Sequence, residues 1–215
     1  MSDFSSPTDF PCGTTPFFIP GPAGKLESLS HCPQTHSQQV LAIICHPHPL
    51  YGGTMQNKVV HTLDKTFNKM GLSTLRFNFR GVGKSAGEYS QGVGELDDLY
   101  AIADWCQQRL PEYRLWLSGF SFGAYIAMKA AQVLNPDRLI TVAPPVNIFD
   151  FSALKAPASP WLLVQGDADE IVDAQQVQQW ALQFNQVDMV KLHGAGHFFH
   201  GRLNELQKII SERLA

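Results

Sequence analysis

A serine flanked by glycines is the residue of this chain with the clearest chemical potential. Gly119-Phe120-Ser121-Phe122-Gly123 matches the pattern Gly-x-Ser-x-Gly, with an apolar strand-like run before it and helically spaced apolar residues after it. In that setting a sharp turn exposes the serine hydroxyl, and only glycine on either side avoids the neighbouring backbone. We therefore expect Ser121 to be a nucleophile. The alternative is an incidental serine in a glycine-rich turn.

A serine nucleophile requires a base, and the base requires an acid that orients it. Three histidines follow the last expected strand: His193, His197 and His200. We expect His197 to be the base, because two glycines precede it in a loop just past the strand. In the same interpretation His193 closes the strand and His200 opens the final helix, so both have structural or surface roles.

The loop after the expected strand 161–165 supplies the candidate acid. It contains four carboxylates: Asp167, Asp169, Glu170 and Asp173. We expect Asp169 to orient His197 because it lies midway in the loop, whereas Asp167, the alternative, directly follows the turn glycine. Asp173 precedes a helix and is expected to be its N-cap, and Glu170 is expected to face solvent.

An acyl-transfer site also needs N–H donors for the oxyanion that forms on the substrate carbonyl. The N–H of Phe122, the residue after the nucleophile, is the expected first donor. The second is expected in the His-Pro-His-Pro run at 46–49, where the prolines have no N–H. We expect it to be His48, with Leu50 or a later residue as the alternative. A metal-binding role for this run is disfavoured because no carboxylate is nearby.

A glycine-rich segment over residues 80–85, Arg-Gly-Val-Gly-Lys-Ser, invites comparison with a phosphate-binding loop. The pattern G-x-x-x-x-G-K-[ST] requires glycine at position 78, where this chain has Asn78. The pattern G-x-G-x-x-G fails as well, because Ala86 occupies the third glycine position. We therefore exclude nucleotide binding and expect Arg80 to tie this loop down by hydrogen bonds or an ion pair.

Strand and helix signals alternate along the chain from residue 17. The expected strands are a hairpin over 17–20 and 25–31, then 40–45, 72–79, 114–120, 138–143, 161–165 and 187–192; the expected helices lie near 59–70, 96–110, 122–134, 174–184 and 203–214. This alternation predicts a doubly wound, mostly parallel α/β sheet with an N-terminal β-hairpin. We expect one domain over residues 16–215 after a flexible tail over 1–15. Ligands of such sheets bind beyond the carboxyl ends of the strands, where every candidate residue lies.

Composition and charge exclude several classes of protein. The chain has 16 Lys and Arg against 19 Asp and Glu, a net charge of −3, with 44% apolar residues. These values exclude a disordered chain and give no electrostatic reason for a nucleic-acid partner. No apolar run is long enough to cross a membrane, and the first residues do not resemble a secretory signal.

The cysteines bear on the cellular compartment. The chain has four cysteines: Cys12, Cys32, Cys45 and Cys106. They lie far apart and form no Cys-x-x-Cys pair, which argues against a zinc site and against a disulfide framework. This spacing favours a reduced, cytoplasmic compartment. Together with the motifs and the composition, it leads us to expect no metal, no cofactor and no membrane partner.

These motifs together resemble the α/β-hydrolase family, and specifically its small bacterial members near the dienelactone-hydrolase-like and prolyl-oligopeptidase-like branches. The likeness covers nearly the whole chain from residue 17 and is carried by residues 45–53, 78–85, 119–123, 166–172 and 194–197. It implies the α/β-hydrolase fold. Many relatives have His-Gly where this chain has His46-Pro47, and dienelactone hydrolases use cysteine as the nucleophile where this chain has Ser121.

The length of one connection bears on the shape of the site. Larger family members insert a helical cap after the strand that follows the nucleophile helix, but here only residues 144–160, 17 in number, are available. We expect an open site, with Phe149 and Phe151 as walls for the acyl or alcohol group. The expected function is a serine hydrolase of carboxylesterase type that cleaves a small acyl ester or thioester through an acyl-enzyme. The alternatives are a short-peptide amidase and a non-catalytic binding module.

Overall fold

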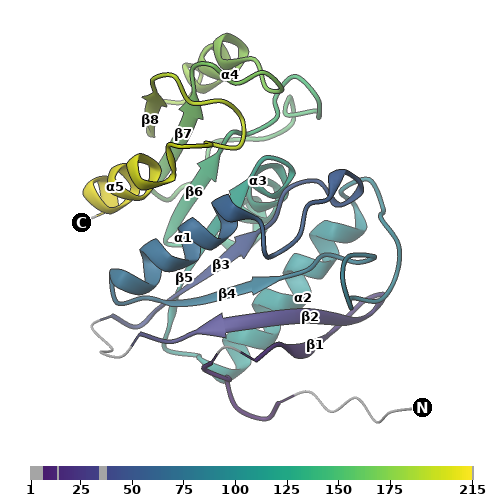
Figure 1. The fold of residues 1–215 in the computed structure, drawn as a ribbon. Helices are drawn as coiled ribbons and strands as arrows, with labels where there is room; N and C mark the ends of the chain where they lie inside the picture. Colours follow the sequence, from purple (N-terminus) through teal and green to yellow (C-terminus); the bar gives the residue numbers. More distant parts are fainter. Residues whose placement is uncertain (1–6, 14, 34–37, 215) are drawn as a thin grey trace.

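The chain folds around one central β-sheet (Figure 1). The computed structural model describes residues 7–13, 15–33 and 38–214. Within these residues the sheet has eight strands in the order β1-β2-β4-β3-β5-β6-β7-β8. The strands are β1 (Phe17–Gly21), β2 (Gly24–His31), β3 (Val40–Cys45), β4 (Ser73–Phe77), β5 (Arg114–Phe120), β6 (Arg138–Val142), β7 (Trp161–Gly166) and β8 (Val187–Leu192). The pairs β1–β2 and β2–β4 are antiparallel, and the other neighbouring pairs are parallel.

Helices cover both faces of this sheet (Figure 1). They are α1 (Lys58–Lys69), α2 (Gly94–Arg109), α3 (Phe122–Leu134), α4 (Ala174–Ala181) and α5 (Leu203–Leu214). The apolar side chains of α2, α3 and α4 belong to one core cluster, and those of α1 and α5 belong to the other. Strand β3 separates the two clusters, with Ile43 in the first and Ile44 in the second. Its six residues are all buried, as its unbroken apolar run predicts.

The structure confirms the predicted fold class and the order of its elements. Five elements have the predicted bounds: β3, β5, α3, β8 and α5. Strand β4 ends at Phe77, two residues before the predicted end, and the Phe79 N–H donates to the His46 ring at 3.0 Å instead of to a neighbouring strand. The connection from β6 to β7 contains no helix over residues 143–160, so the structure has no helical cap there.

A disulfide in the N-terminal segment contradicts the prediction, made from the cysteine spacing, that the chain has no disulfide framework. Cys12 and Cys32 form a disulfide with their Cα atoms 5.3 Å apart, while Cys45 and Cys106 are free and buried. The pairing arises because residues 11–13 run beside the end of β2, where the Gly13 N–H donates to the Ser30 oxygen at 3.3 Å. Both cysteines lie just beyond the open end of the β1–β2 hairpin, where Phe17 pairs with Ser28, so the hairpin brings them together. The expectation of a reduced compartment therefore loses the support it drew from unpaired cysteines.

Part of the predicted flexible tail lies against the domain. Residues 1–6 and 14 are outside the described residues, but residues 7–13 contact α2 and β2. The Arg109 guanidinium donates to the Pro7 oxygen at 2.9 Å, and the Phe10 ring lies 6.2 Å from the Trp105 ring. These contacts, together with the disulfide, hold this stretch on the surface of the sheet and α2.

Candidate active site

The turn between β5 and α3 holds Ser121 in a backbone conformation that few side-chain-bearing residues adopt. Its φ is 54° and its ψ is −121°, and its N–H donates to the Val142 oxygen at 2.9 Å. A Cβ on Gly119 would collide with the Gly123 carbonyl oxygen, and a Cβ on Gly123 would collide with the Cys45 carbonyl oxygen. Both glycines are thus required by close backbone contacts, which also bring the β3 loop against the start of α3.

Ser121, His197 and Asp169 lie in one continuous line of hydrogen bonds. The Ser121 Oγ is 3.1 Å from His197 Nε2, and His197 Nδ1 is 2.9 Å from Asp169 Oδ2. Because a carboxylate only accepts, Nδ1 carries the ring proton, and Nε2 is free to accept from the serine hydroxyl. The His197 side chain is almost fully buried, and its ring lies 5.1 Å from that of Phe120. The three residues come from loops after β5, β7 and β8.

Asp169 is held by donors on both of its oxygens. Oδ1 accepts from the N–H groups of Ile171 at 2.9 Å and Val172 at 2.7 Å, and Oδ2 accepts from Gln165 Nε2 at 3.0 Å as well as from His197. Burial raises the pKa of Asp169, but the hydrogen bonds outweigh it and hold that pKa below its ordinary value. The carboxylate therefore stays ionised and fixed in orientation beside His197.

The other carboxylates of this loop have different partners. Asp167 accepts from His193 Nδ1 at 2.8 Å and from the Gly194 N–H at 2.6 Å, on the surface of the domain. Asp173 accepts from the N–H groups of residues 175 and 176, which confirms it as the N-cap of α4. Glu170 is exposed as predicted, but it also accepts from the His197 N–H at 3.1 Å.

The remaining two histidines of the β8 loop lie outside the hydrogen-bonded line. His193 directly follows β8 with its side chain 97% exposed, so it is a surface residue. His200 is exposed before α5, where its ring stacks on Phe198 at 5.8 Å. Of the three candidates, the structure thus brings only His197 to Ser121.

The loop after β3 borders Ser121 and contains the two candidate N–H donors for that side. The Leu50 N–H is engaged, because it donates to His48 Nδ1 at 3.2 Å. The N–H groups of Tyr51 and Gly53 donate to the His48 oxygen. Among the hydrogen bonds of the described residues, none uses the N–H of His48 or of Phe122. Both N–H groups are therefore free for a ligand.

The glycine-rich loop after β4 is anchored as predicted. Arg80 donates through Nη2 to Asp98 Oδ1 at 2.7 Å and through Nε to Asp98 Oδ2 at 3.1 Å. Its own N–H donates to the same carboxylate at 2.9 Å. Asp98 is fully buried on α2, so this bidentate ion pair fixes the loop against the helix.

A cavity of about 520 Å³ opens beside Ser121 and His197. Its lining residues are Pro47, His48, Tyr51, Gly52, Gly53, Asn57, Ser121, Phe122, Pro145, Ile148, Phe149, Ile171, His197 and Phe198. Phe149 is part of this wall, as predicted. Phe151 is not: its ring packs between Tyr125 at 5.0 Å and Trp180 at 5.0 Å, turned into the core. The prediction that Phe151 lines this cavity is therefore wrong, because packing on Tyr125 and Trp180 buries its ring in the core.

Four large residues of the cavity wall are not predicted from the sequence: Tyr51, Ile148, Ile171 and Phe198. Each is more than a third exposed, although large apolar side chains are usually buried. All four lie in loops that follow strands, which is the signal that points to them. The wall also includes the His48 ring, whose Nε2 lies 3.1 Å from the Tyr89 hydroxyl.

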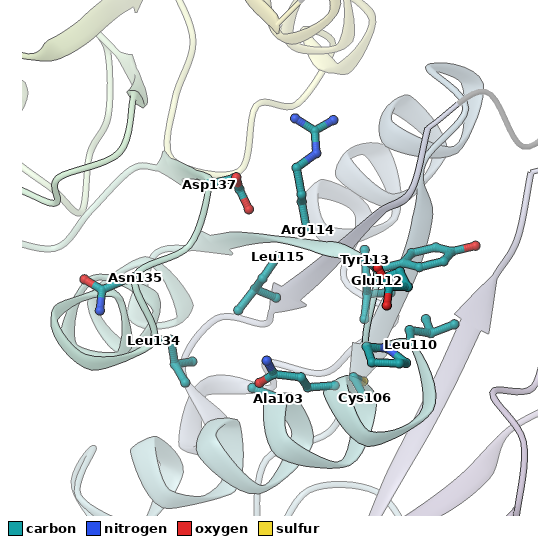
Figure 2. A pocket seen from close by; sticks show the side chains of 13 residues that line it. Ala103, Cys106, Leu110, Glu112, Tyr113, Arg114, Leu115, Leu134, Asn135 and Asp137 are labelled. Carbon is teal, nitrogen blue, oxygen red and sulfur yellow. The ribbon is translucent and has the colours of Figure 1, made fainter.

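A separate cavity of about 370 Å³ lies at the opposite end of the strands (Figure 2). It is lined by Leu41, Arg114 and Leu115, at the start of β3 and β5, and by the C-terminal ends of α2 and α3. In Figure 2 the Arg114 and Asp137 side chains stand at one side of this cavity, with Cys106 at its floor. Ser121 follows the other end of β5, so this cavity is not part of the candidate site.

Comparisons with known proteins agree with this architecture. The model of the family described as "Serine aminopeptidase, S33" matches residues 41–158. An α/β serine hydrolase homologue from Coxiella burnetii is 49% identical, with a TM-score of 0.93, and the match covers 96% of this chain and 100% of that one. A Xanthomonas campestris α/β serine hydrolase without a lid is 42% identical, with a TM-score of 0.92 and coverage of 96% and 95%. An uncharacterized protein of Rickettsia prowazekii is 38% identical over 209 residues, 92% of this chain and 87% of the relative.

A mostly parallel sheet with a serine turn between its central strand and the next helix defines the α/β serine hydrolases. The chain belongs to this class, within the Serine aminopeptidase S33 family and among its members that have no lid. It is thus a member of the hydrolase superfamily. In the described part of the chain, helices are too short or too polar to traverse a bilayer.

Proposed function

We propose that this protein is a serine hydrolase of carboxylesterase type that cleaves a small, uncharged acyl ester or thioester. The observation that carries the proposal is the line of hydrogen bonds from Ser121 Oγ through His197 to Asp169, at 3.1 Å and 2.9 Å. A nucleophile, its base and an orienting acid in hydrogen-bond contact are what covalent acyl transfer requires. A binding module has no need for such an aligned base.

In the first half of the reaction Ser121 becomes acylated. Its Oγ forms a bond to the acyl carbonyl carbon while its proton passes to His197 Nε2, and Asp169 stabilises the resulting imidazolium. The bond between the acyl carbon and the leaving oxygen or sulfur then breaks, and His197 returns the proton to that leaving group. The products of this half are an alcohol or thiol and the acyl-enzyme.

The second half repeats these steps with water. A water molecule gives a proton to His197 and attacks the acyl carbon, and the bond to Ser121 Oγ breaks as the proton returns to the serine. In both halves the carbonyl oxygen carries negative charge, and the free N–H groups of Phe122 and His48 are the donors that stabilise it.

The chemistry of the cavity favours an uncharged, apolar acyl group. Among its lining residues none is Asp, Glu, Lys or Arg, and the wall is built mainly from Tyr51, Ile148, Phe149, Ile171 and Phe198. Burying an unpaired charge against such a wall costs several kcal/mol or more. An acyl chain without charge, in contrast, gains about 25 cal/mol for each Å² of apolar surface removed from water.

A second candidate is an aminopeptidase, which the description of the matched family favours. An aminopeptidase must accommodate the α-ammonium group of its substrate, and a carboxylate is the usual partner for such a group. The cavity lining contains no carboxylate, and Asp169 is occupied by His197 and three further donors. We therefore favour an ester or thioester over a peptide as the substrate.

Two substrates of similar shape separate these candidates. The isobutyryl and alanyl groups have the same shape, with a methyl in the first where the second has an ammonium. We would assay p-nitrophenyl isobutyrate and alanine p-nitroanilide with the wild type and with Ser121→Ala. Ser211→Ala, on α5 and remote from the cavity, is the control variant. We expect the ester alone to turn over, with loss in Ser121→Ala only. Preferred turnover of the anilide would favour the aminopeptidase, and equal turnover in wild type and Ser121→Ala would refute a serine hydrolase.

A further inference from the structure

His46 is a fully buried histidine that takes no part in the hydrogen-bonded line of Ser121, yet both of its ring nitrogens have partners. Nδ1 lies 2.6 Å from the Pro47 carbonyl oxygen, and Nε2 accepts from the Phe79 N–H at 3.0 Å. A carbonyl only accepts and an N–H only donates, so these contacts require the neutral ring with its proton on Nδ1. Burial lowers the pKa of His46 to about 4, which agrees with a neutral ring.

The contact with Pro47 has a directional consequence. The Pro47 carbonyl and the His48 N–H belong to the same planar peptide unit, and in a trans peptide they point to opposite sides. By holding the carbonyl against its own ring, His46 turns the His48 N–H away from that ring. Pro47 itself has no N–H, so the amide of His48 is the first one available after His46.

Gly53 packs against the Pro47–His48 peptide on the side away from the His46 ring. Its N–H donates to the His48 oxygen at 3.0 Å, and a Cβ at this position would collide with the Pro47 carbonyl and lie 2.6 Å from the His48 oxygen. The backbone of Gly53 thus lies directly against the Pro47–His48 peptide. Any side chain here would push that peptide out of place.

His46 and the Pro47–His48 peptide are connected by packing to the turn that holds Ser121. The His46 ring lies 4.7 Å from the Phe79 ring, and Phe79 in turn makes an edge contact with Phe122 at 5.8 Å. The His46 carbonyl oxygen also lies against Gly123, where it leaves no room for a Cβ. One rigid unit therefore sets the distance between the His48 amide and the turn that holds Ser121.

We propose that His46, together with Gly53, is a positioning residue that aims the His48 N–H at the substrate oxyanion. The inference rests on the proposed function, in which that N–H is the second oxyanion donor. It explains why a buried polar ring is placed at the start of this loop. It also gives the two ring nitrogens separate tasks: Nδ1 orients the donor peptide, and Nε2 anchors the ring to Phe79, just after β4.

A matched pair of variants separates these tasks. In His46→Asn the amide nitrogen takes the place of Nδ1 and retains the donor to Pro47, whereas in His46→Gln the amide oxygen takes the place of Nε2 and retains only the acceptor for Phe79. We expect His46→Gln to lower kcat by about 10²-fold with little change in KM, as for loss of one oxyanion donor. His46→Asn should retain most of kcat. Thermal unfolding of both variants reports any purely structural effect.

Two further readouts follow the oxyanion directly. A trifluoromethyl ketone forms a tetrahedral adduct with an oxyanion, so its Ki should rise in His46→Gln in proportion to the fall in kcat/KM. The rate of labelling by a fluorophosphonate should fall in the same order. Gly53→Ala should reproduce the His46→Gln kinetics, because it displaces the same peptide from its other side, and it gives a second, independent test should His46→Gln fail to fold.

The outcomes distinguish this inference from the proposed function. If the wild type is labelled at Ser121 but His46→Gln and His46→Asn lose equal activity, or Gly53→Ala and His46→Gln retain wild-type kcat and Ki, the positioning role is overturned and the serine hydrolase stands. If the wild type itself shows neither labelling nor hydrolysis, the proposed function and this inference fall together.

Discussion

The side-chain amide of Gln165 donates to the same Asp169 oxygen that faces His197, at 3.0 Å and 2.9 Å respectively. Gln165 is the fifth residue of β7 and is fully buried, so the carboxyl end of this strand, next to the edge strand β8, holds the Asp169 side chain in place. The other Asp169 oxygen is held by the N–H groups of Ile171 and Val172. The carboxylate is therefore restrained from two directions before it contacts the histidine.

Replacing Gln165 tests the value of that restraint. Gln165→Leu removes one hydrogen bond to a carboxylate, so we expect kcat to fall by about tenfold, equivalent to about 1.4 kcal/mol. The same change removes the Gln165 Oε1, a buried atom with no partner among the described residues, so thermal stability should change little. Steady-state kinetics and thermal unfolding measure the two effects. A large loss of stability at unchanged kcat would show that Gln165 serves the core and not Asp169.

The choice between the two aspartates is tested by a pair of amide variants. Asp169→Asn leaves His197 without a carboxylate to fix its tautomer, which in serine triads lowers kcat by about 10⁴-fold. Asp167→Asn alters only the surface contact with His193, so its kcat should stay close to the wild type. Comparable losses in the two variants would contradict the assignment of Asp169.

Phe149 and Phe151 are two residues apart and should respond differently to truncation. Phe149→Ala removes part of the cavity wall, so we expect KM for an apolar ester to rise, with a modest effect on stability. Phe151→Ala removes a buried ring that packs on Tyr125 and Trp180, so it should cost about 3–5 kcal/mol of stability and leave KM unchanged. Ester kinetics and urea unfolding of both variants distinguish the wall from the core.

His46 also makes stability depend on pH. Its folded pKa of about 4 lies below the ordinary value of 6.5, so the unfolded chain binds more protons between these values. The contribution of the neutral ring is therefore complete above pH 6.5 and is lost as the pH falls toward 4. Between pH 7 and pH 4.5 we expect His46 to account for a loss of about 2 kcal/mol in the free energy of unfolding. Urea unfolding at both pH values should show a smaller difference in His46→Asn, and an equal difference would contradict this account.

The sequence suffices for the fold because its apolar patterns are nearly unambiguous. Strand β3 has an unbroken branched-apolar run, and α3 follows a glycine-flanked turn, so both have the predicted bounds. The candidate residues Ser121, Asp169 and His197 could be selected because each follows a strand, and the carboxyl ends of parallel strands meet at one edge of the sheet.

Other features depend on contacts that sequence does not encode locally. The Cys12–Cys32 disulfide joins the two segments that flank the β1–β2 hairpin, so it depends on the pairing of those strands and is not indicated by the spacing of the cysteines alone. Phe151 points into the core because of the path of an irregular loop, which has no periodicity to indicate its faces. The role of His46 depends on Phe79, 33 residues further along the chain, whose N–H meets its ring only after β3 and β4 pair.

Intact-mass analysis after treatment with a fluorophosphonate, followed by peptide mapping, tests the central claim most directly. The reagent reacts with a serine only where a base has activated it, so it reports an assembled nucleophile without knowledge of the substrate. We expect one adduct, located on Ser121, and its absence in Ser121→Ala and His197→Ala that retain the wild-type circular dichroism spectrum. An unlabelled, folded wild type, or an adduct that persists at the same rate in His197→Ala, would contradict the account.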